Sequence, residues 1–227
     1  MKNHNVKNII KDIQVISSKN NNPVTVKGGS DQLKCIGVGT DAAVFHIEGD
    51  TQYVYKVFSE DKLETMEREK QVYEQLGDSP YFPIYYGAGS HFLILSYEKG
   101  VTLYDCLVKG IHIPRQVITD VEEARAYAIS KGLNPRDIHL KNILLHEGRG
   151  KLLDVSEYLK EGNDHRWTYL RKGYEEYYDL IDGKEIPLWL IETVRKWYNQ
   201  KQGSPFDFQE FVQRLIKIFR IGNSGGE

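Results

Sequence analysis

Apolar residues in the first third of the chain follow the two-residue period of β-strands. Between residues 31 and 58, short alternating runs are separated by glycine-containing turns, and Gly49-Asp50 is a typical hairpin signal. The runs are 33–36, the glycine-containing 37–45, and 52–58. The pattern predicts three neighbouring strands.

Residues 60–76 change to the 3.6-residue period of an amphipathic helix, which Gly77 ends. The apolar members of one face are Met66, Tyr73 and Leu76. Glu69 shares that face, and a carboxylate that points inward needs a cationic partner. Lys56 on the preceding predicted strand is the obvious candidate. A surface helix with i,i+4 charge pairs explains the other charged residues but not Glu69.

The rest of the pattern predicts two more strands and a helical second half. The runs 81–87 and 91–100 are separated by a Gly-Ala-Gly turn, and Thr102 is placed to cap a short helix. Further helices are predicted at 115–131, 164–180, 187–200 and 206–220. An N-terminal stripe of helical spacing, before a loop at 17–23, consists of Val6, Ile9, Ile10 and Ile13. Strands followed by helices are typical of the α+β class.

The composition is that of a globular protein and argues against several partners. The 227 residues suffice for one domain or two small lobes, and a net charge of −2 offers no basic field for nucleic acid or anionic lipid. Cys35 and Cys106 form no metal-ligand pattern. No apolar run approaches the roughly 20 residues that span a bilayer, and Lys11-Asp12 interrupts any signal-peptide core. We expect a cytoplasmic protein without a nucleic-acid partner or a membrane span.

Three polar residues around the next apolar run carry the strongest indication of chemistry. Asp137 precedes Asn142 by five residues, and Asn142 opens an apolar run that leads into a predicted hairpin. Asp154 follows that hairpin. Phosphoryl transfer needs a carboxylate that orients the attacking hydroxyl and oxygen ligands that hold Mg²⁺ against nucleotide phosphates. Polar turns flanking a buried strand would show the same residues, so the pattern alone leaves both interpretations open.

The segment 135–142 resembles the catalytic loop of the protein kinase-like superfamily, H-R-D-L-x-x-x-N, which is followed by a D-F-G motif. Asp137 matches the catalytic aspartate, Asn142 the metal-binding asparagine and Asp154 the second metal ligand. The Asp-Val-Ser sequence at 154–156, in place of D-F-G, resembles the small atypical RIO-type kinases. The resemblance implies a small bacterial-type Ser/Thr protein kinase.

The first half of the chain matches the nucleotide-binding positions of the same superfamily. Gly37 and Gly39 match the first two glycines of G-x-G-x-x-G-x-V, and Val44 matches its valine. Lys56 lies in Val-Tyr-Lys-Val, which is similar to the V-A-I-K strand whose lysine binds phosphates and pairs with a helix glutamate, here Glu69. Taken alone, these residues also fit a plain hairpin turn and a solvated strand lysine.

The resemblance implies a two-lobed α+β fold and a full set of site residues. An antiparallel-sheet N-lobe would span 24–98 and a minimal helical C-lobe 99–221, with an N-terminal extension at 1–23 and a disordered tail at 222–227. ATP and Mg²⁺ would bind, and a protein hydroxyl would accept the phosphate. The implied residues are Asp137 for catalysis; Gly37, Gly39, Val44, Lys56, Glu69, Ser96, Tyr97 and Glu98 for the nucleotide; and Asn142 and Asp154 for the metal.

Departures from the superfamily pattern keep other functions open. Ala42 replaces the third glycine, and Pro135 replaces a histidine. His139 stands where many Ser/Thr kinases carry a lysine that stabilises the transferred phosphoryl group, a task that a protonated histidine could share. No A-P-E motif follows. The open alternatives are a protein kinase, a kinase of the same fold that acts on sugars or antibiotics, and a pseudokinase that binds nucleotide and a partner protein.

Overall fold

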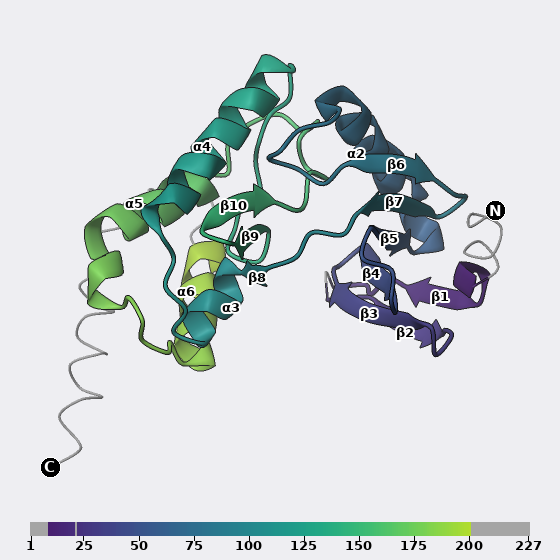
Figure 1. The fold of residues 1–227 in the computed structure, drawn as a ribbon, viewed down its shortest axis with the longest axis horizontal. Helices are drawn as coiled ribbons and strands as arrows, with labels where there is room; N and C mark the ends of the chain where they lie inside the picture. The colour runs from purple at the N-terminus through teal and green to yellow at the C-terminus, as the bar shows by residue number, and fades with distance from the viewer. Residues whose placement is uncertain (1–8, 21, 201–227) are drawn as a thin grey trace, which may run out of the picture. The chain divides into compact units, whose positions relative to one another are not determined.

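The computed structural model describes residues 9–20 and 22–200. The predicted helix at 206–220 and the predicted tail at 222–227 lie outside the described residues, as does Val6 of the N-terminal stripe. Figure 1 shows the described elements in chain order.

The chain divides into two compact units. They are Met1–Asp105 with Ile113–Trp167, and Cys106–His112 with Thr168–Glu227. Every predicted site residue belongs to the first unit, so the candidate site lies within one compact body. The lobe boundaries proposed from the sequence, 24–98 and 99–221, stay a prediction.

A five-stranded antiparallel sheet forms the N-terminal part of the first unit (Figure 1). Its strands, in spatial order, are β3 (Leu33–Val38), β4 (Ala42–Ile47), β5 (Tyr53–Phe58), β7 (Phe92–Ser96) and β6 (Tyr85–Ala88). The three strands predicted between 31 and 58 are confirmed. The run predicted at 81–87 pairs only after Pro83, which lacks the N–H that a central strand residue donates.

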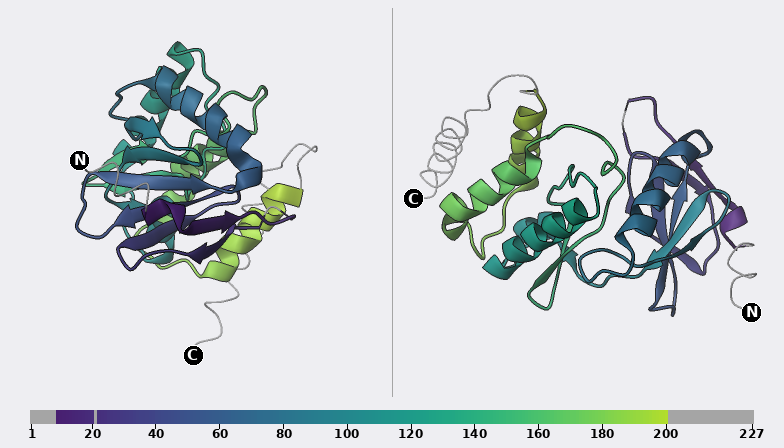
Figure 2. Two further views of the ribbon diagram at one scale, coloured as in Figure 1. Left: turned by 90° about the vertical axis from the view of Figure 1, so that its right-hand side faces the viewer. Right: turned by 90° about the horizontal axis from the view of Figure 1, so that it is seen from above.

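Alternation along β5 sends neighbouring side chains to opposite faces of this sheet. Tyr55 and Val57 join an apolar cluster on one face, and Lys56 between them points to the other. The 3-10 turn η1 (Glu60–Lys62) leads into α2 (Leu63–Leu76), which packs beside β6 and β7 (Figure 2). The buried residues of α2 are Met66, Glu69, Val72, Tyr73 and Leu76, which confirms the predicted inward face.

An N-terminal hairpin that the sequence analysis missed packs on the face of the sheet opposite Lys56. Its strands are β1 (Ile13–Ile16) and β2 (Thr25–Gly28). The shared cluster contains Ile10, Ile13, Val15, Val24, Ala43, Phe45, Tyr55, Val57 and Phe92. The predicted helical stripe is wrong at Ile13, because the helical turn described at 9–11 ends before it and Ile13 opens β1. The burial of alternate residues in β1 is strand-like rather than helical.

The first unit continues with a long helix and a small three-stranded sheet. The elements are β8 (Val101–Thr102), α4 (Arg115–Ser130), β9 (Ile143–His146) and β10 (Arg149–Leu152), with the strands ordered β10-β9-β8. The short helix α3 (Leu103–Val108) begins in this unit and continues into the second unit after Asp105. Thr102 caps α3 as predicted, since its Oγ1 accepts a hydrogen bond from the Asp105 N–H at 3.1 Å. Gly132, with φ +77°, follows α4 as predicted.

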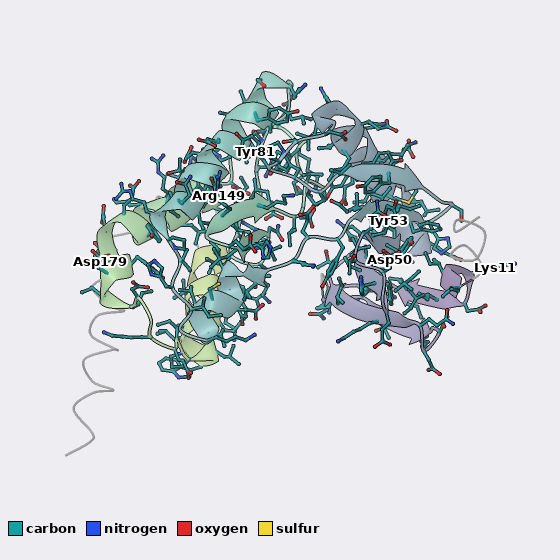
Figure 3. The ribbon with its side chains drawn as sticks, viewed as in Figure 1. Lys11, Asp50, Tyr53, Tyr81, Arg149 and Asp179 are labelled. Carbon is teal, nitrogen blue, oxygen red and sulfur yellow. The ribbon has the colours of Figure 1, made fainter. Side chains whose placement is uncertain are left out.

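Asp120 of α4 fixes this helix to β10. Its buried carboxylate accepts hydrogen bonds from the Arg149 guanidinium at 2.7 to 3.1 Å and from the Gly150 N–H at 2.7 Å. A second contact reaches α4, where the Tyr81 hydroxyl donates to Glu123 at 3.2 Å. Figure 3 labels Arg149 and Tyr81. The segment that contains Asp137 and Asn142 therefore runs between two elements that are held together.

The second unit contains most of α5 (Arg166–Tyr177), then η2 (Tyr178–Leu180) and α6 (Leu188–Gln200). These elements confirm the helices predicted at 164–180 and 187–200. The Ile186 N–H donates to the Leu107 carbonyl oxygen at 2.9 Å, which ties the two chain segments of this unit together.

The antiparallel sheet at the N-terminal side and the helices that follow it confirm the α+β class, and they agree with a kinase-like two-lobed fold. Within the described ranges, no helix is long and apolar enough to cross a bilayer.

The N-terminal hairpin of β1 and β2 should contribute to the stability of the five-stranded sheet. We expect Ile13→Ala, at a position 5% exposed, to lower the free energy of unfolding by about 2–4 kcal/mol, because it leaves a cavity in the shared cluster. Ile16→Ala on the same strand, at a position 37% exposed, should cost less than about 1 kcal/mol. Urea denaturation measures both, and equal small losses would show that the hairpin is not part of the folded core.

The Asp120 contacts predict a pH-dependent contribution to stability. Burial raises the pKa of Asp120, but Arg149, the Gly150 N–H and Gln116 more than offset this and leave it below its usual value. Such a carboxylate stabilises the fold above its unfolded pKa of about 4, and this stabilisation disappears as the pH falls through the folded pKa. Asp120→Asn should therefore cost about 1–3 kcal/mol at pH 7 and progressively less below about pH 4.

Urea denaturation of the wild type and of Asp120→Asn across this pH range measures the effect. Glu123→Gln, at an exposed position on the same helix, is the matched control and should change little. A cost that does not vary with pH would rule out the charged contacts as its source.

Candidate active site

Three of the predicted nucleotide-binding residues form a row across the sheet. Gly37 of β3 pairs with Val44 of β4, and Val44 pairs with Lys56 of β5. Directly paired residues of antiparallel strands present their side chains on the same face. The row therefore lies on the face where Lys56 meets α2.

The glycine-containing turn leaves space on this face. A side-chain carbon placed on Gly37 would meet only Val44, at an ordinary contact distance of 3.7 Å, so the fold itself does not require glycine there. The Gly39 N–H donates to the Ala42 carbonyl at 2.8 Å and closes the turn. The Gly39 carbonyl in turn accepts the Val24 N–H at 2.8 Å, which attaches the N-terminal hairpin to the turn.

Lys56 lies between two carboxylates. Its Nζ donates to both oxygens of Glu69, at 2.6 and 2.7 Å, and lies 3.6 Å from Asp154 Oδ2. The Glu69 side chain is 0% exposed, whereas that of Asp154 is 35% exposed. The Lys56–Glu69 contact expected from the helix face is thus present, and Asp154 adds a second, partly solvated negative charge.

The surroundings shift the pKa values of all three groups. Burial lowers the pKa of Lys56, but the carboxylates of Asp154 and Glu69 more than offset it and raise that pKa above its ordinary value. Burial raises the pKa of Glu69, and Lys56 opposes that rise. Burial also raises the pKa of Asp154, but Lys56 and the Ser156 N–H outweigh it, and the net shift is downward. Lys56 remains a cation and Asp154 an anion at neutral pH.

Hydrogen bonds to backbone carbonyls bring the polar segments of the site together. The Leu153 N–H donates to the Asn142 carbonyl at 2.9 Å, and Asn142 Nδ2 donates to the Asp137 carbonyl at 3.2 Å. The buried Tyr73 hydroxyl of α2 donates to the Leu153 carbonyl at 3.0 Å. Asp137 has φ +56°, a left-handed conformation that is uncommon for residues other than glycine and often found at functional sites.

The oxygen atoms of Asn142 and Asp154 are donors that Mg²⁺ prefers. Asn142 uses its Nδ2 in the hydrogen bond to Asp137, so its Oδ1 can face a cation. Over residues 9–20 and 22–200, no three His, Cys, Asp or Glu side chains gather as a metal-binding group. A magnesium ion at Asn142 and Asp154 would thus complete its shell with phosphate and water oxygens, as nucleotide-bound Mg²⁺ does. The donor set fits such an ion.

Asp137 has two side-chain partners that the sequence analysis missed. Arg166, the first residue of α5, forms an ion pair from Nη1 to Asp137 Oδ1. Asp164 Oδ2 accepts the Asp137 N–H at 2.7 Å, and Asp164 Oδ1 accepts the Arg166 N–H at 3.1 Å. Neither partner belongs to a recognised motif. The available signal was an arginine near the start of the predicted helix 164–180.

Burial and the charge of Arg166 shift the pKa values of two loop residues. Burial raises the pKa of Asp137 to about 6, even though Arg166 acts in the opposite direction. Burial and Arg166 together lower the pKa of His139 to about 4. His139 is therefore neutral near pH 7, which removes the protonated histidine considered as a replacement for the lysine of many Ser/Thr kinases.

Hydrogen bonds hold the three residues at 96–98 that were predicted to bind the nucleotide. Ser96 Oγ accepts the Ile84 N–H at 2.8 Å and donates to Glu98 Oε1 at 2.5 Å. Glu98 Oε2 accepts a hydrogen bond from Lys151 Nζ of β10 at 2.7 Å. The Tyr97 N–H donates to the Gln52 carbonyl, just before β5, at 2.9 Å. The contacts fix this segment, and its role in nucleotide binding stays a prediction.

Comparison with known proteins gives one informative relative. No protein-family model matches the chain. A protein of Bacillus subtilis (strain 168) named "Putative serine/threonine-protein kinase YrzF" is 37% identical over 189 residues. The match covers 82% of this chain and 88% of that protein.

The ion pair between Lys56 and the buried Glu69 should be important for the stability of the fold. Glu69→Gln leaves Lys56 with Asp154 as its remaining carboxylate, so we expect a loss of about 3 kcal/mol in the free energy of unfolding. Glu67→Gln on the exposed side of the same helix removes only the Lys70 pair and should cost about 0.5 kcal/mol or less. Thermal and urea denaturation compare the two variants. Similar losses in both would contradict a special role for the buried pair.

Proposed function

The chain belongs to the protein kinase-like family, and on that basis we propose that it transfers the γ-phosphoryl group of ATP to a serine or threonine hydroxyl of a protein. The cluster of Lys56, Glu69 and Asp154 carries this proposal. A structural ion pair needs only Lys56 and Glu69, whereas a third, partly exposed carboxylate beside the lysine fits a site for metal-bound phosphates.

The row across the sheet supplies the nucleotide site in this proposal. Lys56 binds the phosphates, and Glu69 holds Lys56 in position. The space at Gly37 lets the strand lie close to the phosphates, and Val44 packs against the adenine base. Residues 96–98 offer backbone groups to the adenine edge.

Asn142 and Asp154 would hold Mg²⁺ in this proposal. The ion, when bound, neutralises phosphate charge and aligns the γ-phosphoryl group. Because Leu153 is hydrogen-bonded to Asn142, the two ligands keep a fixed spacing along the site.

Asp137 orients the acceptor hydroxyl and receives its proton. The hydroxyl oxygen forms a bond to the γ-phosphorus, while the bond from that phosphorus to the bridging oxygen of the β-phosphate breaks and ADP leaves. A pKa of about 6 leaves Asp137 mostly ionised at neutral pH, yet basic enough to take up the proton.

The choice of a protein acceptor rests on the name of the Bacillus subtilis relative, which specifies a serine/threonine-protein kinase. The RIO-type assignment from Asp-Val-Ser at 154–156 belongs to the same proposal. The small-molecule kinase and the pseudokinase remain as outcomes that the experiment below distinguishes.

The test incubates the purified protein with Mg²⁺ and γ-labelled ATP and locates the label by mass spectrometry. We expect label on serine or threonine with the wild type and none with Asp137→Ala, which should still bind nucleotide in calorimetry. Asp154→Ala should lose both transfer and Mg²⁺-dependent binding, because it removes a metal ligand. Asp179→Ala, at an exposed position of the second unit, should behave as the wild type.

Unchanged transfer by Asp137→Ala would contradict the mechanism. Nucleotide binding without any labelled residue would exclude transfer to hydroxyls of this protein and would favour the two alternatives. Measurement of ADP release with sugar and antibiotic acceptors would then separate a small-molecule kinase, which releases ADP, from a pseudokinase, which does not.

A further inference from the structure

Arg166 is a cation in direct contact with Asp137 that the kinase resemblance did not assign. Its Nη1 contacts Asp137 Oδ1, and the two side chains are 29% and 31% exposed. It comes from the segment that follows Asp154, at the first turn of α5. The catalytic-loop pattern thus supplies the carboxylate, and a residue remote in sequence supplies its charge partner.

The position of Arg166 is built from several contacts. Asp164 accepts the N–H groups of both Asp137 and Arg166, at 2.7 and 3.1 Å, so one side chain holds the two backbones together. The next residue, Trp167, is buried, and its indole N–H donates to Glu122 of α4 at 2.6 Å. An incidental surface ion pair has no such support, since long side chains at a surface rarely stay in one geometry.

The contact leaves part of the Asp137 carboxylate available. Arg166 engages Oδ1, and among the residues that the structure describes Oδ2 has no hydrogen-bond partner. A carboxylate accepts hydrogen bonds at both oxygens. Oδ2 can therefore accept a hydroxyl proton while Oδ1 remains held. The guanidinium presents several N–H donors in a rigid plane.

We propose that Arg166 is a positioning residue for phosphoryl transfer: it holds Asp137 through Oδ1, leaves Oδ2 to the acceptor hydroxyl and adds positive charge beside the transferred group. This inference rests on the function proposed above. Charge fixed in place beside a transferring phosphoryl group acts mainly on the transition state, so its loss lowers kcat more than it changes KM for ATP.

The test compares the wild type with Arg166→Ala, Arg166→Lys and Asp137→Ala in steady-state assays of ATP turnover, with water or protein as acceptor. Arg166→Ala should lower kcat roughly a hundredfold with little change in the KM for ATP. Arg166→Lys keeps one charge without the planar fork and should recover part of the loss. Added guanidinium, at a concentration that does not denature the protein, should accelerate Arg166→Ala but not the wild type.

Arg171→Ala is the matched control, because it removes the same charge from the same helix at a residue paired with Glu175. It should keep wild-type kinetics. The guanidinium rescue and the Arg166→Lys variant keep the test valid if Arg166→Ala is less stable, because a purely structural loss would not be restored by a free cation.

The outcomes separate the two proposals. An active wild type, an inactive Asp137→Ala and an Arg166→Ala with wild-type kcat would overturn the role of Arg166 alone. A faster Arg166→Ala would also overturn it and would mark the ion pair as inhibitory. A wild type that turns over no ATP with any acceptor would overturn the proposed function and this inference together.

Discussion

The buried carboxylate of Glu69 is the constraint on which the side of the sheet facing α2 depends. A carboxylate with no solvent exposure is tolerated only when a cation and hydrogen bonds compensate for its lost hydration. Lys56 meets this need from the middle of β5, and the contact fixes both the rotation and the distance of α2 against the sheet. The same contact places the Lys56 ammonium within 3.6 Å of Asp154, so a requirement of folding also assembles the charges of the candidate site.

A second group of contacts holds the catalytic-loop segment between elements that cannot move independently. Asp120 joins α4, which precedes the segment, to β10, which follows it. Leu153 is hydrogen-bonded to Asn142 from one side and to Tyr73 of α2 from the other. The surrounding structure therefore sets the backbone of the polar residues, including the uncommon conformation of Asp137.

The N-terminal hairpin gives the sheet its second buried face. Without it, the aromatic and aliphatic residues of β4, β5 and β7 that it covers would form an exposed apolar patch. Its backbone also binds Gly39, so the hairpin reaches the turn that we propose lies over the phosphates. An extension that looks peripheral in the sequence is thus part of the half of the first unit where we propose that the nucleotide binds.

The sequence by itself determined the features that depend on local order. Alternation predicted β3, β4 and β5, and helical periodicity predicted α2 and α4. The apolar face of α2 identified Glu69 and its partner Lys56. These predictions hold because strand and helix periods place neighbouring residues on defined faces whatever surrounds them. The sequence did not predict β1 and β2 of the N-terminal hairpin, because runs of four residues are too short to show a clear period.

Only the tertiary structure decided which distant residues meet. Hydrogen bonds join residues that are 27 to 53 positions apart in the sequence. They connect Asp137 with Asp164, Asp120 with Arg149, and Glu98 with Lys151. No local spacing relates such residues, because the packing of whole elements decides their distance in space. Sequence patterns therefore identified the residues that resemble a phosphoryl-transfer site, whereas the fold determined the charges and hydrogen bonds that surround them.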